Sequence, residues 1–153
     1  MMLHIAPVNW YSWAFKVSDE SRTVADIAMS WWREKGVLAA DGVNYRVYRE
    51  GLTSGDFVLE APDGVLARAE KPSAFRREFI VRHDGREYAL RPRSMFGRTF
   101  ILTAGSSEIG SVEPHNAFTR RAVADLPADL PVPVRAFIVW LVMIAWKRTQ
   151  DAS

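Results

Sequence analysis

The sequence contains no cysteine, and its only histidines are His4, His83 and His115. The lack of cysteine excludes disulfides, thiolate zinc sites and cysteine nucleophiles, and it fits a reducing compartment. None of the three histidines stands at metal-ligand spacing to another histidine or to a pair of carboxylates. We therefore expect neither a metal nor another cofactor.

Targeting signals and catalytic motifs are also missing. The first thirteen residues lack a basic start, a continuous apolar run and a small-residue cleavage site, so we expect a cytoplasmic protein. The stretch Ala104-Gly105-Ser106-Ser107-Glu108 lacks the last glycine of a nucleophile elbow. No lysine precedes Ser111, as a phosphate-binding loop would require. With no recognisable nucleophile, base and orienting group, we expect a protein that is not an enzyme.

Charge is close to balanced overall but unevenly distributed. The formal net charge is +2, too small to indicate a nucleic-acid partner. Residues 1–65 carry 6 basic and 9 acidic side chains, whereas residues 66–100 carry 9 basic and 4 acidic ones. The middle of the chain is thus the segment with a clear positive sign.

Turn signals and short alternating segments dominate the 153 residues, which we expect to form a single domain over 1–153. Asp41-Gly42, Asp63-Gly64 and Asp84-Gly85 are dipeptides typical of type I′ hairpins. Between the turns, apolar and polar residues alternate with a period of two, which indicates antiparallel strands with one dry face. We predict strands at Trp10–Val17, Thr23–Trp31, Val37–Ala40, Val43–Tyr48, Phe57–Ala61, Val65–Ala69, Phe75–His83, Arg86–Arg91, Arg98–Thr103, Glu108–Val112 and Thr119–Asp125. The spacing of the apolar residues in Thr23–Trp31 also fits a helix, and this alternative stays open.

An unbroken apolar run extends from Ala136 to Trp146, after a proline-rich bridge and before Lys147 and Arg148. As a helix the run would span roughly 16 Å, far less than the ~30 Å hydrocarbon core of a membrane. A helix without a polar face must be surrounded by protein. We therefore predict a central helix over about 133–148, enclosed by a closed antiparallel barrel of about eleven strands, and no transmembrane segment. A β-strand is the competing assignment for the apolar run, since it is rich in valine and isoleucine.

This pattern of elements resembles the tubby-like barrel superfamily, which includes the tubby C-terminal domain, the LURP-one-related proteins and the phospholipid scramblases. The segments that carry the resemblance are Tyr45-Arg46-Val47-Tyr48, Phe57-Val58-Leu59-Glu60, Phe96-Gly97-Arg98-Thr99-Phe100, Glu108-Ile109-Gly110-Ser111-Val112 and the terminal apolar run. The resemblance implies a closed barrel of about twelve strands wrapped around a hydrophobic helix, and a membrane-surface or phosphoinositide role. The calcium-binding segment of the scramblases has no counterpart, so calcium-dependent lipid movement is not expected.

The basic middle segment supplies the candidate site. We predict that Arg76, Arg82, Arg91, Arg93 and Arg98 lie on neighbouring strands and form a patch for anionic phospholipid or phosphoinositide head groups, because the planar guanidinium suits phosphate. A solvated wall, with these arginines paired to Glu78 and Glu87, explains the same residues. One ring of Trp31-Trp32 is a further candidate, as an anchor in a lipid interface.

The function that these observations favour is a non-enzymatic binding module, cytoplasmic or peripheral at a membrane. A barrel that binds another protein, with no small ligand, is the alternative. A carrier with an internal ligand pocket is a third class, which a filled barrel would exclude.

Overall fold

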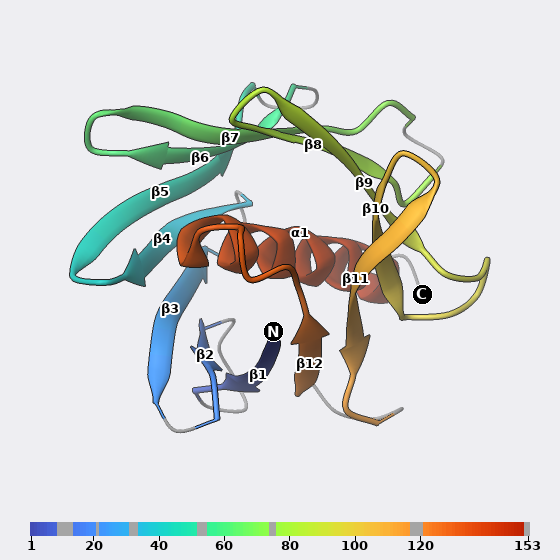
Figure 1. The fold of residues 1–153 in the computed structure, drawn as a ribbon, viewed down its shortest axis with the longest axis horizontal. Coiled ribbons are helices and arrows are strands. Elements are labelled where there is room, and N and C mark those ends of the chain that lie inside the picture. The colour runs from blue at the N-terminus through green and yellow to red at the C-terminus, as the bar shows by residue number, and fades with distance from the viewer. Residues whose placement is uncertain are drawn as a thin grey trace.

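The computed structural model describes residues 1–8, 14–20, 22–30, 34–51, 55–73, 76–116 and 121–151. These residues form twelve strands followed by one helix (Figure 1). In chain order the elements are β1 (Met2–Pro7), β2 (Ala14–Ser18), β3 (Thr23–Ser30), β4 (Lys35–Ala40), β5 (Val43–Arg49), β6 (Phe57–Ala61), β7 (Gly64–Glu70), β8 (Phe79–His83), β9 (Arg86–Pro92), β10 (Phe100–Ala104), β11 (Ser107–Pro114), β12 (Ala122–Asp125) and α1 (Val132–Asp151).

The strands form one closed barrel in which each strand pairs antiparallel with its neighbours in the chain. The seam is the pairing of β1 with β12, where Leu3 lies opposite Ala124. The predicted fold class, a mainly β closed barrel with a C-terminal helix, is confirmed. Strand β1 was not among the predicted strands, and the region Thr23–Trp31 is a strand, not a helix, over its described residues.

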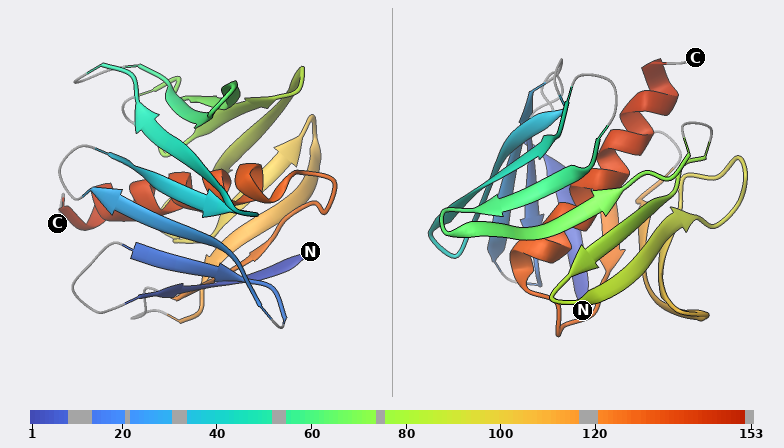
Figure 2. Two further views of the ribbon diagram at one scale, coloured as in Figure 1. Left: turned by 90° about the vertical axis from the view of Figure 1, so that its left-hand side faces the viewer. Right: turned by 90° about the horizontal axis from the view of Figure 1, so that it is seen from above.

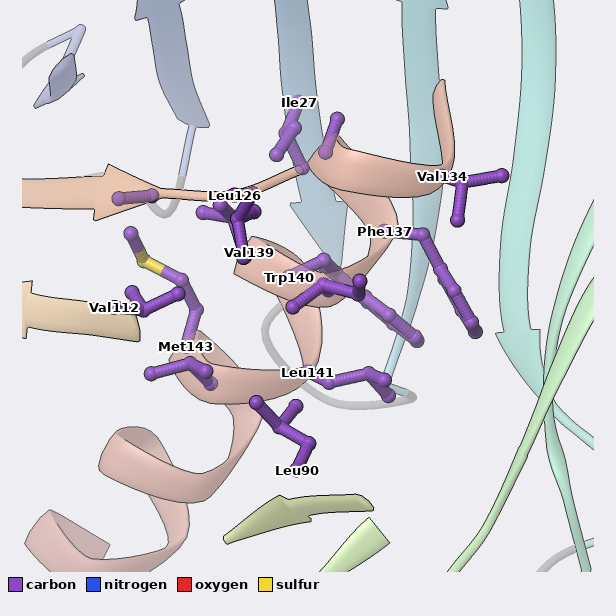
Figure 3. Packing of buried hydrophobic residues seen from close by; sticks show 14 of the residues in the cluster. Ile27, Leu90, Val112, Leu126, Val134, Phe137, Val139, Trp140, Leu141 and Met143 are labelled. Atoms are coloured by element: carbon purple, nitrogen blue, oxygen red, sulfur yellow. The ribbon is translucent and has the colours of Figure 1, made fainter. Parts of the chain in front are cut away.

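The barrel is filled by α1, whose residues from Val134 to Trp146 are all buried. Side chains from the inner face of the wall, such as Ile27, Leu90 and Val112, point at the helix from different sides (Figure 3). At its centre Trp140 packs edge-on against Phe57, with the ring centroids 5.8 Å apart. The enclosure explains why the helix needs no polar face.

The helix is longer than predicted, beginning at Val132 and ending at Asp151 instead of covering 133–148. Its last turn is polar and emerges from the barrel, so the apolar run could not reveal where it ends. Within the part of the chain that the structure describes, no helix has the length and apolarity needed to cross a membrane.

Two of the three Asp-Gly hairpins are as predicted. Asp41 and Gly42 have φ angles of 52° and 74°, and Asp84 and Gly85 have φ angles of 51° and 73°, as type I′ turns require. The third prediction is wrong, because the two central residues there are Pro62 and Asp63, and the proline ring fixes a negative φ. The positive φ falls instead on Gly64, at 146°.

The two ends of the barrel differ. The connections that follow the odd-numbered strands, together with the end of α1, lie at one end, which we call the loop end. The connections that follow the even-numbered strands, four of them two-residue hairpins, lie at the other end, which we call the hairpin end. Helix α1 begins at the hairpin end and runs through the barrel to the loop end (Figure 2).

Candidate functional site

The five predicted arginines divide between the wall of the barrel and its loop end. Arg82 and Arg91 are exposed on the outer faces of β8 and β9, as predicted. The placement of the other three on strands is wrong. Because β8 begins only at Phe79 and β10 only at Phe100, Arg76 lies in the β7–β8 connection, and Arg93 and Arg98 lie in the β9–β10 connection.

On the wall, Arg82 is neutralised by two carboxylates. Its Nη1 donates to Glu70 at 3.1 Å and its Nε donates to Glu87 at 3.2 Å. The hydrogen bond to Glu70 is the largest of the effects that raise the pKa of Arg82. The pattern continues around the wall, where Arg68 pairs with Glu50 at 2.9 Å. For Arg82 the structure therefore favours the solvated, ion-paired interpretation, with Glu87 as one of the two expected partners.

The other exposed arginines of the predicted set differ in whether a carboxylate neutralises them. The Nη2 of Arg93 lies 3.3 Å from Glu108, in an exposed pair. Within the described part of the chain, Arg76 and Arg91 have no carboxylate partner, although both are exposed. These two guanidinium groups keep their hydrogen-bonding capacity for an external anion.

Arg77, which the prediction left out, organises the β9–β10 connection. Its Nη2 donates to the carbonyl oxygens of Met95 and Gly97, at 3.0 and 2.9 Å. Its guanidinium also lies over the ring of Phe100, 5.7 Å from the centroid. The one available signal was its parity, because Arg77 shares the alternation of inward-facing Phe79 and so broke the pattern of outward arginines.

Arg98 connects this loop to the end of the helix. Its guanidinium stacks on Trp146, 4.8 Å from the ring centroid, while its carbonyl oxygen accepts a hydrogen bond of 2.8 Å from the indole Nε1. Burial lowers the pKa of Arg98. Of the five predicted residues, Arg98 is thus the one built most firmly into the fold.

A second cationic group surrounds the point where α1 leaves the barrel. The Nε and Nη2 of Arg148 each donate to a carboxylate oxygen of Glu34 at 2.6 Å, and Arg49 lies 3.5 Å from the same carboxylate. Both guanidinium groups lie over the ring of Phe57, at 5.5 Å for Arg49 and 5.4 Å for Arg148.

Lys71 completes this group. Its Nζ donates to the carbonyl oxygens of Ser73 and Arg76, each at 2.6 Å. The pKa of Lys71 is lowered first by burial and then by the charges of Arg148 and Arg49. Two arginines thus share the carboxylate of Glu34, and Lys71 adds a third cation close enough to both arginines for their charges to act on it.

The two ends of the barrel carry opposite charge. Among the described residues, the connections at the hairpin end hold six acidic side chains and one basic side chain: Asp19, Glu20, Asp41, Asp63, Asp84 and Asp129 against Arg22. The described connections at the loop end hold six basic and four acidic side chains: Lys71, Arg76, Arg77, Arg93, Arg98 and Arg121 against Glu34, Glu50, Asp56 and Glu78. At the end of α1, Lys147 and Arg148 against Asp151 add one further positive charge to the loop end.

Some residues singled out in the sequence lie outside the part of the chain that the structure describes. Trp31 and Trp32, the candidate lipid anchors, and Phe75, the predicted start of a strand, lie outside the described residues. Among the residues that are described, no group of three histidine or carboxylate side chains is placed to hold a metal ion.

No protein-family model, no curated protein and no solved structure matches this chain.

Proposed function

We propose that this protein is a non-enzymatic binding module that docks its loop end against an anionic membrane surface, where its arginines contact phospholipid or phosphoinositide head groups. The observation that carries the proposal is the separation of charge between a basic loop end and an acidic hairpin end. The resemblance of the sequence to tubby-like barrels supports it. On this proposal the protein is cytoplasmic and peripheral at the membrane.

The cationic side chains at the loop end provide the attraction. Arg76, in the β7–β8 connection, and Arg91, one residue before the loop-end terminus of β9, have no carboxylate partner in the described chain, and the guanidinium of Arg98 stands beside the exit of the helix. Each basic side chain near an anionic leaflet contributes about 1 kcal/mol to binding, within a screening distance of about 10 Å. Three such groups would therefore hold the protein on the surface at low ionic strength and release it at high salt.

The hairpin end determines the orientation. Asp41, Asp63 and Asp84 lie at successive turns of that end, and an anionic surface repels them. The barrel axis would therefore stand steeply on the membrane, with the end of α1 closest to the lipid.

Co-sedimentation with vesicles tests this function. The protein is mixed with phosphatidylcholine vesicles, and with the same vesicles containing phosphatidylserine or a phosphoinositide, at low and at high salt. We expect binding to the anionic vesicles alone and loss of binding at high salt. The double variant Arg76→Gln/Arg91→Gln should bind more weakly.

The matched control is Arg22→Gln/Arg86→Gln, which removes the same charge from the hairpin end. It should bind like the unmodified protein. An absence of binding at low salt, or equal binding by the two double variants, would remove the proposal.

A second function, binding of another protein, is favoured by a groove of about 710 Å³ on the barrel. Its lining includes Ala28, Gly36 and Val37, with Arg46 and Tyr48 among the polar residues. A stoichiometric protein partner that is lost on Val37→Asp, and retained by the Arg76→Gln/Arg91→Gln variant, would favour this function over membrane docking.

A further inference from the structure

The β9–β10 connection, residues 93–99, places two large apolar side chains in solvent. Met95 is 80% exposed and Phe96 is 93% exposed, the highest values among the exposed large hydrophobic residues of the described chain. In Figure 1 the connection, drawn in yellow, extends beyond the strands that it joins. Single exposed apolar side chains are common on protein surfaces, whereas contiguous ones mark interaction sites, and Met95 and Phe96 are adjacent.

The turn that carries these two residues is fixed in place. The backbone N–H of Gly97 donates to the Oγ of Ser94 at 3.1 Å, and the backbone N–H of Arg93 donates to the carbonyl oxygen of Thr99 at 2.8 Å. A Cβ at Gly97 would lie 2.5 Å from the Ser94 Oγ, so this close turn favours glycine. Together with the two hydrogen bonds from Arg77, these contacts hold Met95 and Phe96 outward instead of letting them fold back on the barrel.

The surroundings of the turn are basic. Arg93 and Arg98 belong to the same connection, and Arg77 donates hydrogen bonds to the carbonyl oxygens of Met95 and Gly97 within it. Arg98 also links it to Trp146 at the end of α1, so the turn belongs to the loop end. An apolar tip flanked by arginines is complementary to a surface whose outer layer is anionic and whose inner layer is hydrocarbon.

We propose that Met95 and Phe96 insert into the interfacial layer of the membrane when the loop end docks, and act as its apolar anchor. This inference rests on the proposed function and specifies how the protein is retained on the surface. Electrostatic attraction brings the loop end to the anionic head groups, and the two side chains then pass between them. The backbone of the turn stays outside, because its polar groups need water or the hydrogen bonds from Arg77 and Ser94.

The size of the apolar tip favours a membrane over a protein partner. A large aromatic side chain buries about 150–250 Å² of surface, so Met95 and Phe96 together bury about 400 Å² at most. A stable protein interface buries about 800 Å² on each partner. Two side chains are too few for such an interface, but they suffice for an anchor that assists electrostatic attraction.

A label on the turn reports insertion directly. Because the chain has no cysteine, Met95→Cys provides a single site for an environment-sensitive fluorophore and leaves Phe96 in place. Vesicles of phosphatidylcholine and phosphatidylserine should shift the emission to the blue, and quenchers attached to the acyl chains should quench it. The matched control is Ser106→Cys, an exposed position in the β10–β11 hairpin at the opposite end, whose label should not respond.

A binding measurement supplies the second test. Phe96→Ser should raise the apparent dissociation constant for these vesicles about tenfold or more, since a buried phenylalanine contributes about 1.5–3 kcal/mol and each 1.4 kcal/mol is tenfold. The salt dependence of binding should stay unchanged, because no charge is removed. Val65→Ser, which removes a 47% exposed apolar side chain at the hairpin end, should bind like the unmodified protein.

The outcomes separate the two proposals. If the unmodified protein binds anionic vesicles but Phe96→Ser binds equally well, the anchor is wrong and the proposed function stands. If the unmodified protein binds no vesicle, both are wrong. A dimer in light scattering that Phe96→Ser abolishes would identify the turn as a protein contact and overturn the anchor.

Discussion

At the scale of single residues, Glu34 links three parts of the fold. It lies just before β4, binds Arg148 of α1 through two hydrogen bonds and contacts Arg49 of β5. All three side chains are at least two-thirds buried, with exposed fractions of 21%, 32% and 19%. Because of this burial, we expect the carboxylate of Glu34 to contribute more to the free energy of unfolding than the carboxylates of the exposed pairs on the wall.

We expect Glu34→Gln to lower the free energy of unfolding by about 1–3 kcal/mol, because it leaves two largely buried guanidinium groups without their counter-charge. Urea denaturation followed by circular dichroism measures the change. The control is Asp26→Asn, which removes an exposed pair with Lys16 at 3.7 Å and should cost less than about 1 kcal/mol. Equal losses in the two variants would contradict the assigned role of Glu34.

The predictable part of the site is also clearest at this scale. Outward alternation correctly placed Arg82 and Arg91, because each lies within a regular strand. It failed for Arg76, which lies in a connection and not on a strand. Arg98, predicted to begin a strand, also lies in a connection, whose path depends on contacts distant in the sequence such as that with Trp146. The exposure of Phe96 was equally hidden, since an apolar residue near a strand is expected to be buried.

At the scale of elements, α1 is predictable because its constraint is local. A helix that is apolar on all sides must be shielded from water by the rest of the protein, and here the strands enclose it. The hairpins were predictable for a similar reason, since Asp41-Gly42 and Asp84-Gly85 determine their own turn type. Strand β1 was not, because its pairing with β12 joins residues far apart in the chain, and no local pattern records that contact.

Replacing Leu141, which lies in the middle of α1 and is fully buried, tests the role of this helix. We expect Leu141→Asp to unfold the domain, because an unpaired buried carboxylate costs several kcal/mol out of a typical total of about 5–15. Circular dichroism and light scattering detect the loss of structure.

Gln150→Asp, at an exposed position of the same helix, is the matched control and should remain folded. If Leu141→Asp stays folded and monomeric, the helix is not the core of the barrel.

At the scale of the whole molecule, the charge separation could have been predicted from the order of the strands. The net charge of +2 conceals it. In a barrel whose consecutive strands are antiparallel, alternate connections share one end, so Asp41, Asp63 and Asp84 must lie together. That inference needed only the strand order, and it would have placed the basic residues of the odd-to-even connections at the opposite end.

The closed seam between β1 and β12 gives a prediction at the same scale. Leu3→Asn should lower the free energy of unfolding by roughly 2–5 kcal/mol, because Leu3 is buried in the core at this seam. Met2→Asn places the same amide on the neighbouring residue, which is 44% exposed, and should cost less than about 1 kcal/mol. Hydrogen exchange of the β12 amides should accelerate in the first variant alone, and equal protection in both would show that closure does not depend on β1.

The position of α1 after all twelve strands also constrains the biosynthesis of the protein. A ribosome completes every strand before it translates the helix that their inner faces cover. At about 5–20 residues per second, the nascent chain carries these apolar faces for several seconds with nothing to pack against. The barrel therefore cannot complete its core until the helix emerges, and until then its exposed apolar strand faces make the nascent chain prone to aggregation.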